Sequence, residues 1–231
     1  MTIDKLKASE LASVFKRMLA DNETRKIGSD ECVELQNINF IADQDWIIRQ
    51  PNYDYANREI GWYVSQSLYV DDIPGKVPEI WKAVADKDGK INSNYGWCVF
   101  SNENGNQYRN CLNALVKDPH TRQAVMIYIR PSMHTDAYSN GMHDFMCTFS
   151  TQCFLNDMDG DNYRLKYIVN QRSQDAVFGY NNDILWHQYV QSRLCDDLST
   201  RLGKNIWTEP IECNVGSLHV YKRHFKHLES K

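Results

Sequence analysis

The sequence predicts an α+β fold in which helices cover a mostly antiparallel or mixed β-sheet. Stretches with helical spacing of apolar residues dominate the first half of the chain, whereas β-branched and aromatic runs typical of strands gather in the second half. No internal repeat, low-complexity tract or Pro/Gly/Ser-rich linker divides the 231 residues. We therefore expect a single domain that spans residues 1–231.

Apolar spacing predicts several helices. The first covers residues 3–19, with Asp4 as its N-cap. The longest covers residues 183–202 and is amphipathic. An acidic residue at such a boundary commonly caps the helix, which is one interpretation of Asp183. Shorter helices are expected over residues 55–68, 78–85 and 108–116, and a turn-rich loop over residues 86–96.

β-Branched and aromatic runs predict the strands of the sheet. These runs cover residues 33–40, 124–129, 145–155, 163–170 and 215–221. Cys147 falls inside the third run. Because side chains alternate along a strand, His219 and Tyr221 are expected to share one face of the last run.

The charge balance and composition exclude several classes of function. With 26 Lys and Arg against 30 Asp and Glu, the net charge is −4 and the pI is about 6.0. This excludes a generally basic nucleic-acid coat but allows a local basic pocket, so no direct nucleic-acid partner is expected. No apolar run reaches the roughly 18 residues of a membrane span, and the N-terminus lacks a signal-peptide stretch. We expect a soluble cytoplasmic protein with no membrane partner.

The cysteines argue against a metal site and against a disulfide framework. There are seven, an odd number, and none belongs to a CxxC pair. Most are expected to be reduced and buried, with one or two at most carrying chemistry. They are Cys32, Cys98, Cys111, Cys147, Cys153, Cys195 and Cys213.

Four local clusters contain the residues that could carry chemistry. They cover residues 144–148, 170–175, 178–183 and 216–221. Each has an ordinary structural interpretation. Cys147 could fill the interior, Arg172 could pair with Asp175 at the surface, and His219 and Tyr221 could be half-buried strand residues.

Taken together, the order and spacing of these clusters resemble the thymidylate synthase family. The matching motifs are Cys147, then Gln171-Arg172-Ser173-x-Asp175, then Gly179, then His219-x-Tyr221. Upstream, Ile80-Trp81-x-x-x-Ala85-Asp86-x-x-Gly89-x-Ile91-x-x-x-Tyr95-Gly96 resembles the folate-side loop of that family, and Glu59 matches its active-site glutamate. The resemblance covers roughly residues 19–224, and five ordered motifs are a specific signal. It implies the thymidylate synthase fold and a homodimer formed through the sheet.

Within that superfamily, position 183 indicates the substrate. Thymidylate synthases have an asparagine there, whose amide pairs with the uracil edge, whereas this chain reads Gly179-Tyr-Asn-Asn-Asp183. A carboxyl group can accept from the amino group of cytosine and, when protonated, donate to N3. Residues 92–97, 130–133 and 145–148 also resemble the deoxycytidylate hydroxymethylases of bacteriophages. The resemblance therefore implies deoxycytidylate (dCMP) as substrate and a product that enters modified DNA.

The resemblance implies a covalent mechanism, with 5,10-methylenetetrahydrofolate as co-substrate and no metal. The Cys147 thiolate would add to C6 of dCMP, C5 would take the one-carbon unit, and water would complete 5-hydroxymethyl-dCMP. Glu59 would order water near the folate, Tyr95 would assist removal of the C5 proton, and Asp183 would hold the cytosine edge. Local positive charge would lower the pKa of Cys147.

The remaining residues of the implied site would bind ligands. Arg172 and Ser173 match phosphate ligands from the same subunit, and Arg122 matches an arginine that reaches into the neighbouring site of the homodimer. His219 and Tyr221 would bind the sugar hydroxyl. On the folate side the resemblance implies Trp81, Asp175 and Gly179.

Two positions depart from the family, and several alternatives stay open. Gln123 stands where a second cross-dimer arginine is usual, and Thr148 replaces the histidine that follows the nucleophile in thymidylate synthases, which favours the hydroxymethylase branch. The close alternatives are a dCMP methyltransferase, a thymidylate synthase-like enzyme with a methyl product, and a CMP hydroxymethylase. A catalytically silent binding protein is the alternative from another class, and the intact Cys147 argues against it.

Overall fold

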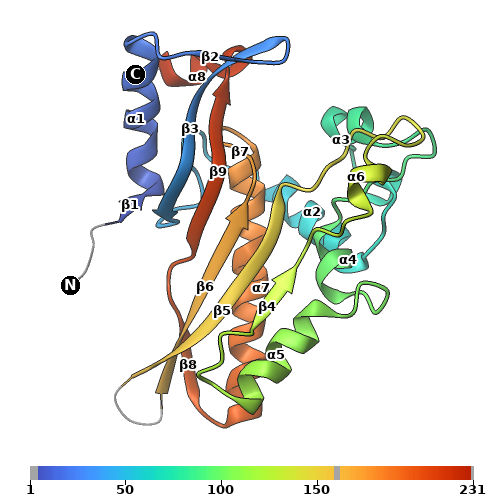
Figure 1. Cartoon of the computed structure of the whole chain (residues 1–231), viewed down its shortest axis with the longest axis vertical. Coiled ribbons are helices and arrows are strands. Elements are labelled where there is room, and N and C mark those ends of the chain that lie inside the picture. Colours follow the sequence, from blue (N-terminus) through green and yellow to red (C-terminus); the bar gives the residue numbers. More distant parts are fainter. Residues whose placement is uncertain (1–4, 159–161, 230–231) are drawn as a thin grey trace.

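A mixed β-sheet forms the centre of the structure, a computed structural model that describes residues 5–158 and 162–229 (Figure 1). Its strands in this part of the chain are β1 (Leu6–Lys7), β2 (Arg25–Ile27), β3 (Asp30–Ile41), β4 (Val125–Ile127), β5 (Thr148–Asp157), β6 (Asn162–Gln171), β7 (Gln174–Asp175), β8 (Asn205–Thr208) and β9 (Glu212–Tyr221). The main path runs β1-β3-β9-β6-β5-β4, and β2, β7 and β8 pair with β3, β9 and β6. Three neighbouring pairs (β3–β9, β5–β6 and β4–β5) are antiparallel, whereas β6–β9 is parallel.

Helices cover one face of this sheet. They are α1 (Ala8–Ala20), α2 (Tyr53–Ser65), α3 (Glu79–Val84), α4 (Tyr95–Phe100), α5 (Gln107–Lys117), α6 (Met133–Asp136), α7 (Gly179–Leu202) and α8 (Lys226–Glu229), with short 3₁₀ turns at Val70–Asp72 and Lys222–His224. Figure 1 shows α7 running behind β5 and β6, and both α5 and α2 pack against it. Among the described residues, no helix lies in front of β5, β6 and β9 in this view, so that face of the sheet is open.

The longest described helix is α7, with 24 residues. Neither it nor any other helix in residues 5–158 and 162–229 has the apolar length of a bilayer span.

Side-chain alternation along β6 explains why the helices lie on one face. Leu165, Tyr167 and Val169 are fully buried beneath the helical layer, whereas Lys166 and Ile168 between them are partly exposed on the open face. The β-branched and aromatic residues of this run made the strand predictable from the sequence. The predicted α+β fold is confirmed, and so are the main helices and strands within a few residues of their expected bounds.

Three local expectations need correction. The first helix begins at Ala8 with Lys7 as its N-cap, and the expected cap Asp4 lies outside the described residues. The long helix begins at Gly179, so Asp183 lies inside it and does not cap it. The Asp175 carboxylate organises this helix entry instead, because it accepts a hydrogen bond from the amide of Val177 (2.7 Å).

Cys147 lies immediately before β5 and not inside it, which corrects the predicted strand 145–155. The carbonyls of Phe145, Met146 and Cys147 all accept hydrogen bonds from Arg172, so this segment is occupied by an arginine and not by a neighbouring strand. Several elements were not anticipated, including β1, β2, β7, β8, α4 and α6. These are short and depend on tertiary pairing, which leaves little local signal.

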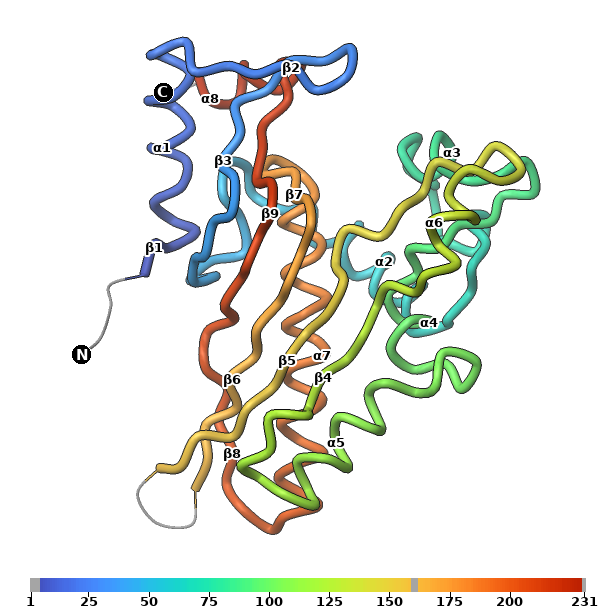
Figure 2. Tube along the Cα trace, viewed as in Figure 1, coloured from blue at the N-terminus to red at the C-terminus, as the bar shows by residue number. Residues whose placement is uncertain are grey.

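The topology brings the ends of several elements together near one end of the sheet. Figure 2 shows the end of β6, the short β7 and the start of α7 beside the beginning of β5. The antiparallel register of β5 and β6 makes the residue before β5 a neighbour of the residue after β6. Residues that are distant in the sequence therefore meet in this region.

Gly96 allows α4 to approach α2 closely. A Cβ atom at this position would lie 1.7 Å from the carbonyl oxygen of Tyr63, far inside van der Waals contact. The contacting atom is backbone and cannot rotate away. This close approach also lets the rings of Tyr63 and Tyr95 stack, with centroids 5.2 Å apart. Gly96 therefore sets the position of Tyr95 through helix packing.

We expect the Gly96→Ala variant to lose at least about 3 kcal/mol of unfolding free energy, because the helices must separate to admit the methyl group. Urea unfolding of the purified chain measures this loss. Gly61→Ala is the matched control, since Gly61 is exposed on α2 and has nothing within 4 Å of its Cβ position. The control should be as stable as wild type or more stable by up to about 1 kcal/mol. Equal stability of Gly96→Ala and wild type would contradict the packing argument.

Candidate active site

Arg172 holds the segment that carries Cys147. Its backbone amide donates to the Cys147 carbonyl (2.9 Å). Its guanidinium donates through Nε to the Met146 carbonyl (3.0 Å) and through Nη2 to the Phe145 carbonyl (2.6 Å). The same Nη2 lies 3.7 Å from the sulfur of Cys147. One arginine thus fixes the backbone of this segment and places a positive charge beside the thiol.

Gln171, the last residue of β6, connects this segment to Asp183. Its side-chain amide donates to the Thr148 hydroxyl (3.3 Å), to the Asp183 carboxylate (3.3 Å) and to the side-chain carbonyl of Gln174. The Thr148 hydroxyl donates in turn to the hydroxyl of Tyr95 (3.2 Å). A chain of polar side chains therefore joins the cysteine segment, α4 and α7.

Glu59 is a carboxyl group on α2 that is almost completely removed from water. It is 3% exposed, and it accepts hydrogen bonds from the Tyr55 hydroxyl and from the indole N–H of Trp81 (3.0 Å). Burial raises the pKa of Glu59 to about 7, because it disfavours the charged form more than these two hydrogen bonds favour it. Glu59 can therefore take up or release a proton near neutral pH.

Asp183 has a similar proton affinity. Desolvation, together with the negative charge of Glu59, raises its pKa to about 7. Hydrogen bonds from Gln174, Tyr95 and Gln171 act in the opposite direction. Two carboxyl groups on different helices therefore influence each other, and both can exist protonated or ionised at neutral pH.

Cys147 is the most accessible cysteine of the chain. The other six are buried, and all seven are free. Burial nevertheless raises the pKa of the Cys147 thiol to about 11, and the charges of Asp183 and Asp144 add to this effect. Arg172 lowers the pKa, as expected from the sequence, but it does not outweigh burial. The expectation of a lowered thiol pKa is therefore wrong for the chain without ligands.

The second half of the site is built where β7 pairs with β9. This pairing sets Asp175 opposite His219. The rings of His219 and Tyr221 lie 4.6 Å apart on the same strand, so the predicted shared face is confirmed. Burial lowers the pKa of His219, which favours the neutral ring. Gly179 begins α7 beside these residues, and a Cβ there would lie 3.2 Å from the side-chain nitrogen of Gln174.

Two candidate ligand residues lie at different distances from this cluster. Ser173 directly follows Arg172 and is partly buried between β6 and β7. Arg122 is exposed before β4, where its carbonyl accepts a hydrogen bond from the Gln152 side chain (2.9 Å). Gln152 lies roughly 16 Å along β5 from Cys147, at about 3.3 Å for each strand residue. The structure therefore does not bring Arg122 to the cysteine of its own chain.

Several polar residues of this site had no assigned role in the sequence analysis. Gln171 and Gln174 belong to a polar cluster that the sequence analysis singled out. Their hydrogen-bond partners could not be predicted, because these depend on which groups the fold places around each side-chain amide. Tyr55 precedes Glu59 by one helical turn, a spacing that could have indicated the contact. Among residues 5–158 and 162–229, no cluster of three or more His, Cys, Asp or Glu side chains could hold a metal ion.

The fold, together with a cysteine, an arginine and two carboxyl groups at one end of the sheet, matches one family. A family model described as thymidylate synthase matches residues 47–231, so the chain belongs to the thymidylate synthase family.

Curated relatives narrow the comparison within this family. The chain is 46% identical over 200 residues to the deoxycytidylate 5-hydroxymethyltransferase of Enterobacteria phage T4, which covers 84% of this chain and 77% of that protein. The protein of the same name from Enterobacteria phage T6 is 44% identical over the same length. The thymidylate synthase of Francisella tularensis is more distant, with 20% identity over 183 residues that cover 75% of this chain and 63% of that protein.

A solved structure supports the fold independently. Thermostable thymidylate synthase A from Bacillus subtilis superposes with a TM-score of 0.67, covering 97% of this chain and 84% of that one. At 18% identity this likeness shows the fold alone. The thymidylate synthase fold that the sequence motifs implied is therefore confirmed.

The raised pKa of Glu59 predicts a pH-dependent stability. Between its ordinary pKa of 4.5 and about 7, the unfolded chain ionises while the folded chain keeps the proton, so stability falls as the pH rises. We expect Glu59→Gln to remove this loss, because a glutamine carbonyl can accept the bonds from Tyr55 and Trp81. Relative to wild type, the variant should gain on the order of 3 kcal/mol between pH 4.5 and pH 8.

Urea unfolding at these two pH values measures the change. Glu103→Gln serves as the control, since Glu103 is exposed in the loop after α4. A stability difference between Glu59→Gln and wild type that does not vary with pH would show that Glu59 has the same pKa in the folded and the unfolded chain, and would contradict the raised value.

Proposed function

We propose that this chain transfers a one-carbon unit from 5,10-methylenetetrahydrofolate to C5 of dCMP and admits water to give 5-hydroxymethyl-dCMP and tetrahydrofolate. The observation that carries this proposal is the carboxyl group of Asp183. It stands where thymidylate synthases have an asparagine, and Gln171 links it to the segment of Cys147. The identity of 44–46% to phage deoxycytidylate 5-hydroxymethyltransferases supports the same substrate. We also propose that the activity takes place in the cytoplasm.

Asp183 suits cytosine better than uracil for reasons of hydrogen bonding. Gln171, Gln174 and Tyr95 form hydrogen bonds with the carboxyl group, so a base would replace part of these contacts. A protonated carboxyl can donate to N3 of cytosine and accept from its 4-amino group. The pKa of about 7 means that Asp183 holds this proton in a large fraction of the molecules at neutral pH. Uracil carries an N3–H donor and a C4 carbonyl, which match this arrangement poorly.

Binding of the base can activate the nucleophile. The charge of Asp183 raises the pKa of Cys147, so a proton held between Asp183 and N3 removes that unfavourable effect while Arg172 stays beside the sulfur. The thiolate would then add to C6 of the pyrimidine, which makes C5 nucleophilic. We infer that the high thiol pKa of the free chain is lowered when cytosine occupies the site.

The remaining polar groups would manage protons and water. The Tyr95 hydroxyl accepts from Thr148, next to the nucleophile, and would help remove the C5 proton through ordered water. Glu59 would order the water that completes the product, since its proton exchanges near neutral pH. Thymidylate synthases have a histidine where Thr148 stands.

Arg172 and Ser173 would bind the phosphate of dCMP. Nε and Nη2 of Arg172 are engaged by the cysteine segment, whereas Nη1 makes no hydrogen bond to the described part of the chain. That nitrogen and the exposed position of Arg172 leave donors for a phosphate oxygen. His219 and Tyr221, paired on β9, would receive the sugar hydroxyl.

The residues near Trp81 fit a folate. Ile80 is 64% exposed beside Trp81, so α3 offers an apolar surface for a flat heterocycle next to Glu59. Asp175 uses one carboxylate oxygen for the helix entry and would offer the other to pterin N–H groups, with Gly179 leaving room at the start of α7. The folate, when bound, supplies the one-carbon unit at the oxidation level of formaldehyde.

We expect wild type to convert dCMP, with a product heavier by one hydroxymethyl substituent, and to prefer dCMP to dUMP. Asp183→Asn should shift the ratio of kcat/KM values toward dUMP by roughly 10–100-fold or more, since one matched pair is lost and another is gained. An asparagine carbonyl can still accept from Gln171. Mass spectrometry of the product and steady-state kinetics with both nucleotides measure these quantities.

Other outcomes identify other functions. A methyl product with dihydrofolate would indicate a methyltransferase, equal use of CMP would remove the deoxyribose preference, and binding without turnover would indicate a silent binding protein. An unchanged preference in Asp183→Asn would remove Asp183 from base recognition. Asp71→Asn is the control, because Asp71 is an exposed carboxylate in the 3₁₀ turn Val70–Asp72 and has no assigned role in the site.

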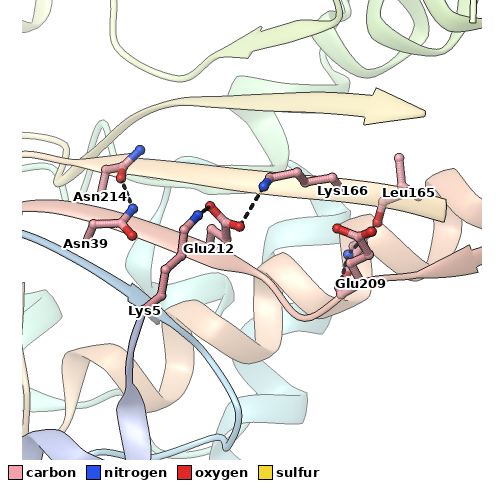
Figure 3. A network of polar contacts seen from close by, with 8 residues as sticks. Lys5, Asn39, Leu165, Lys166, Glu209, Glu212 and Asn214 are labelled. Carbon is pink, nitrogen blue, oxygen red and sulfur yellow. Dashed lines mark hydrogen bonds and ion pairs between the residues drawn. The ribbon is translucent and has the colours of Figure 1, made fainter. Parts of the chain in front are cut away.

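We also propose that the open face of the sheet forms a homodimer interface. Several of its polar groups are already paired within the chain, as Figure 3 shows for part of the face. The Glu212 carboxylate accepts from Lys166 (2.6 Å) and from Lys5, and Asn39 donates to Asn214 across β3 and β9. Burial of this face would therefore leave few unsatisfied donors or acceptors.

Apolar side chains lie on the same face of the sheet. The registers place Phe154 opposite Lys166, and Ile168 opposite Gln152, which pairs in turn with Val125. Ile127, two residues further along β4, is 51% exposed. A second copy of the chain would remove this apolar area from water. Arg122 emerges at the edge of this face beside Gln152, so it is available to a partner subunit.

A mixed dimer tests the role of Arg122. We expect Cys147→Ser and Arg122→Ala to be inactive separately, and coexpression of the two to restore about a quarter of wild-type activity, because one site of each mixed dimer is intact. Coexpression of Cys147→Ser with Arg172→Ala is the matched control and should restore nothing, since Arg172 acts within its own subunit. A monomer in light scattering, or no restoration in the first pair, would contradict the shared site.

A further inference from the structure

Asp144 is a buried carboxylate that fastens two separate segments of the site. It is 6% exposed and accepts three hydrogen bonds from one short loop. The backbone amides of Asn92 and Ser93 donate to its Oδ2, both at 2.7 Å, and the Ser93 hydroxyl donates to its Oδ1 at 2.6 Å. Charge-assisted hydrogen bonds of this kind are short and strong.

The loop that Asp144 binds leads directly into Tyr95. Asn94 caps α4, since its side chain accepts from the amide of Trp97 (2.7 Å) and donates to the Ser67 carbonyl (2.7 Å). Tyr95 is the first residue of that helix. The loop has no freedom to move without moving the tyrosine, because only Asn94 separates Tyr95 from the anchored Ser93.

The other end of this connection is the nucleophile segment. Asp144 precedes Cys147 by three residues, and the intervening carbonyls are held by Arg172. A second tether stabilises the loop, because Arg130 donates to the Asn92 side chain (3.0 Å) and stacks on the Trp97 ring (4.5 Å). Asp144 is thus the direct link between the residues that precede Tyr95 and those that precede Cys147.

The charge of Asp144 opposes nucleophile activation. Among the groups that face the Cys147 thiol, Arg172 lowers its pKa, whereas Asp183 and Asp144 raise it. A site that needs a thiolate is expected to lack a second carboxylate unless the carboxylate does something else. The three hydrogen bonds indicate that the role of Asp144 is to hold the loop of Asn92 and Ser93. An amide side chain at this position could accept only part of these bonds.

We propose that Asp144 is a positioning residue that holds the hydroxyl of Tyr95 in place relative to Cys147 for removal of the C5 proton. This inference deepens the proposed function and rests on it. Asp144 does not touch the substrate and acts through the loop of Asn92 and Ser93. The geometry that depends on it includes the contact of Thr148 with Tyr95 (3.2 Å).

The test separates thiol reactivity from proton removal. In Asp144→Asn, the rate of Cys147 alkylation by iodoacetamide should rise at lower pH than in wild type, because a negative charge beside the sulfur is gone. Exchange of a C5 deuterium label of dCMP with solvent, measured with methylenetetrahydrofolate present so that C5 loses its hydrogen during transfer, should fall by about 10–100-fold, because Tyr95 is misplaced. Peptide mass spectrometry follows the alkylation, and NMR follows the exchange.

Ser93→Ala is the second variant, chosen because it removes a single hydroxyl. It keeps the carboxylate, so the pH dependence of Cys147 alkylation should match wild type, while the exchange rate falls by less than in Asp144→Asn. Alkylation of Cys98, which is buried on α4, reports loosening of the structure in both variants.

Each other result has a definite meaning. Exchange by Asp144→Asn at the wild-type rate would overturn the positioning role alone. Alkylation of Cys98 in parallel with Cys147 would show a general structural role and overturn it too. Absence of C5 exchange by wild type would contradict the proposed function itself, and the inference with it.

Discussion

Removal of carboxyl groups from water is the constraint on which the site depends. Glu59 accepts hydrogen bonds from Tyr55 and Trp81, and Asp183 accepts one from Gln171. In both groups a few directed hydrogen bonds replace contacts with water. Burial raises the two pKa values more than these hydrogen bonds lower them, so both carboxyl groups have a pKa of about 7. Side chains that are ordinarily permanent anions therefore become proton carriers at neutral pH. The folded chain loses stability to keep them so, which is characteristic of a functional site.

The same removal from water raises the pKa of Cys147, which under the proposed function is the nucleophile, and this opposition suggests how the parts cooperate. A thiol with a pKa of about 11 is mostly protonated in the free chain, in spite of Arg172. The negative charge of Asp183 contributes to that value. A base that binds the protonated carboxyl group of Asp183 therefore lowers the pKa of the Cys147 thiol at the same time. Under the proposed function, recognition of cytosine and activation of Cys147 are then one electrostatic event, and a poorly matched base fails in both respects.

The sequence predicted the main elements and the family better than the local surroundings of the candidate site residues. β-Branched and aromatic runs identified β6 and β9, and motif order identified the family, because both signals depend on which side chains occur along the chain. The burial of Cys147 could not be predicted in this way, since it depends on which parts of the chain the fold brings around it. For the same reason the cap assigned to Asp183 was wrong: Asp175 begins the helix through a turn whose partners only the fold supplies. The amide network of Gln171 and Gln174 likewise depends on directions that composition does not encode.

Arg172 links the architecture of the site to the proposed dimer. Nε and Nη2 of its guanidinium contact the backbone of the cysteine segment and the sulfur. Within the described chain, only Nη1 is therefore free to bind a phosphate. A phosphate dianion needs more donors than one nitrogen and the Ser173 hydroxyl provide. Arg122 stands roughly 16 Å away along β5 in its own subunit, by strand geometry, and Gln123 beside it carries no charge. Under the proposed function, a second copy that presents Arg122 across the open sheet face supplies the missing cation, and the monomer alone has an incomplete substrate site.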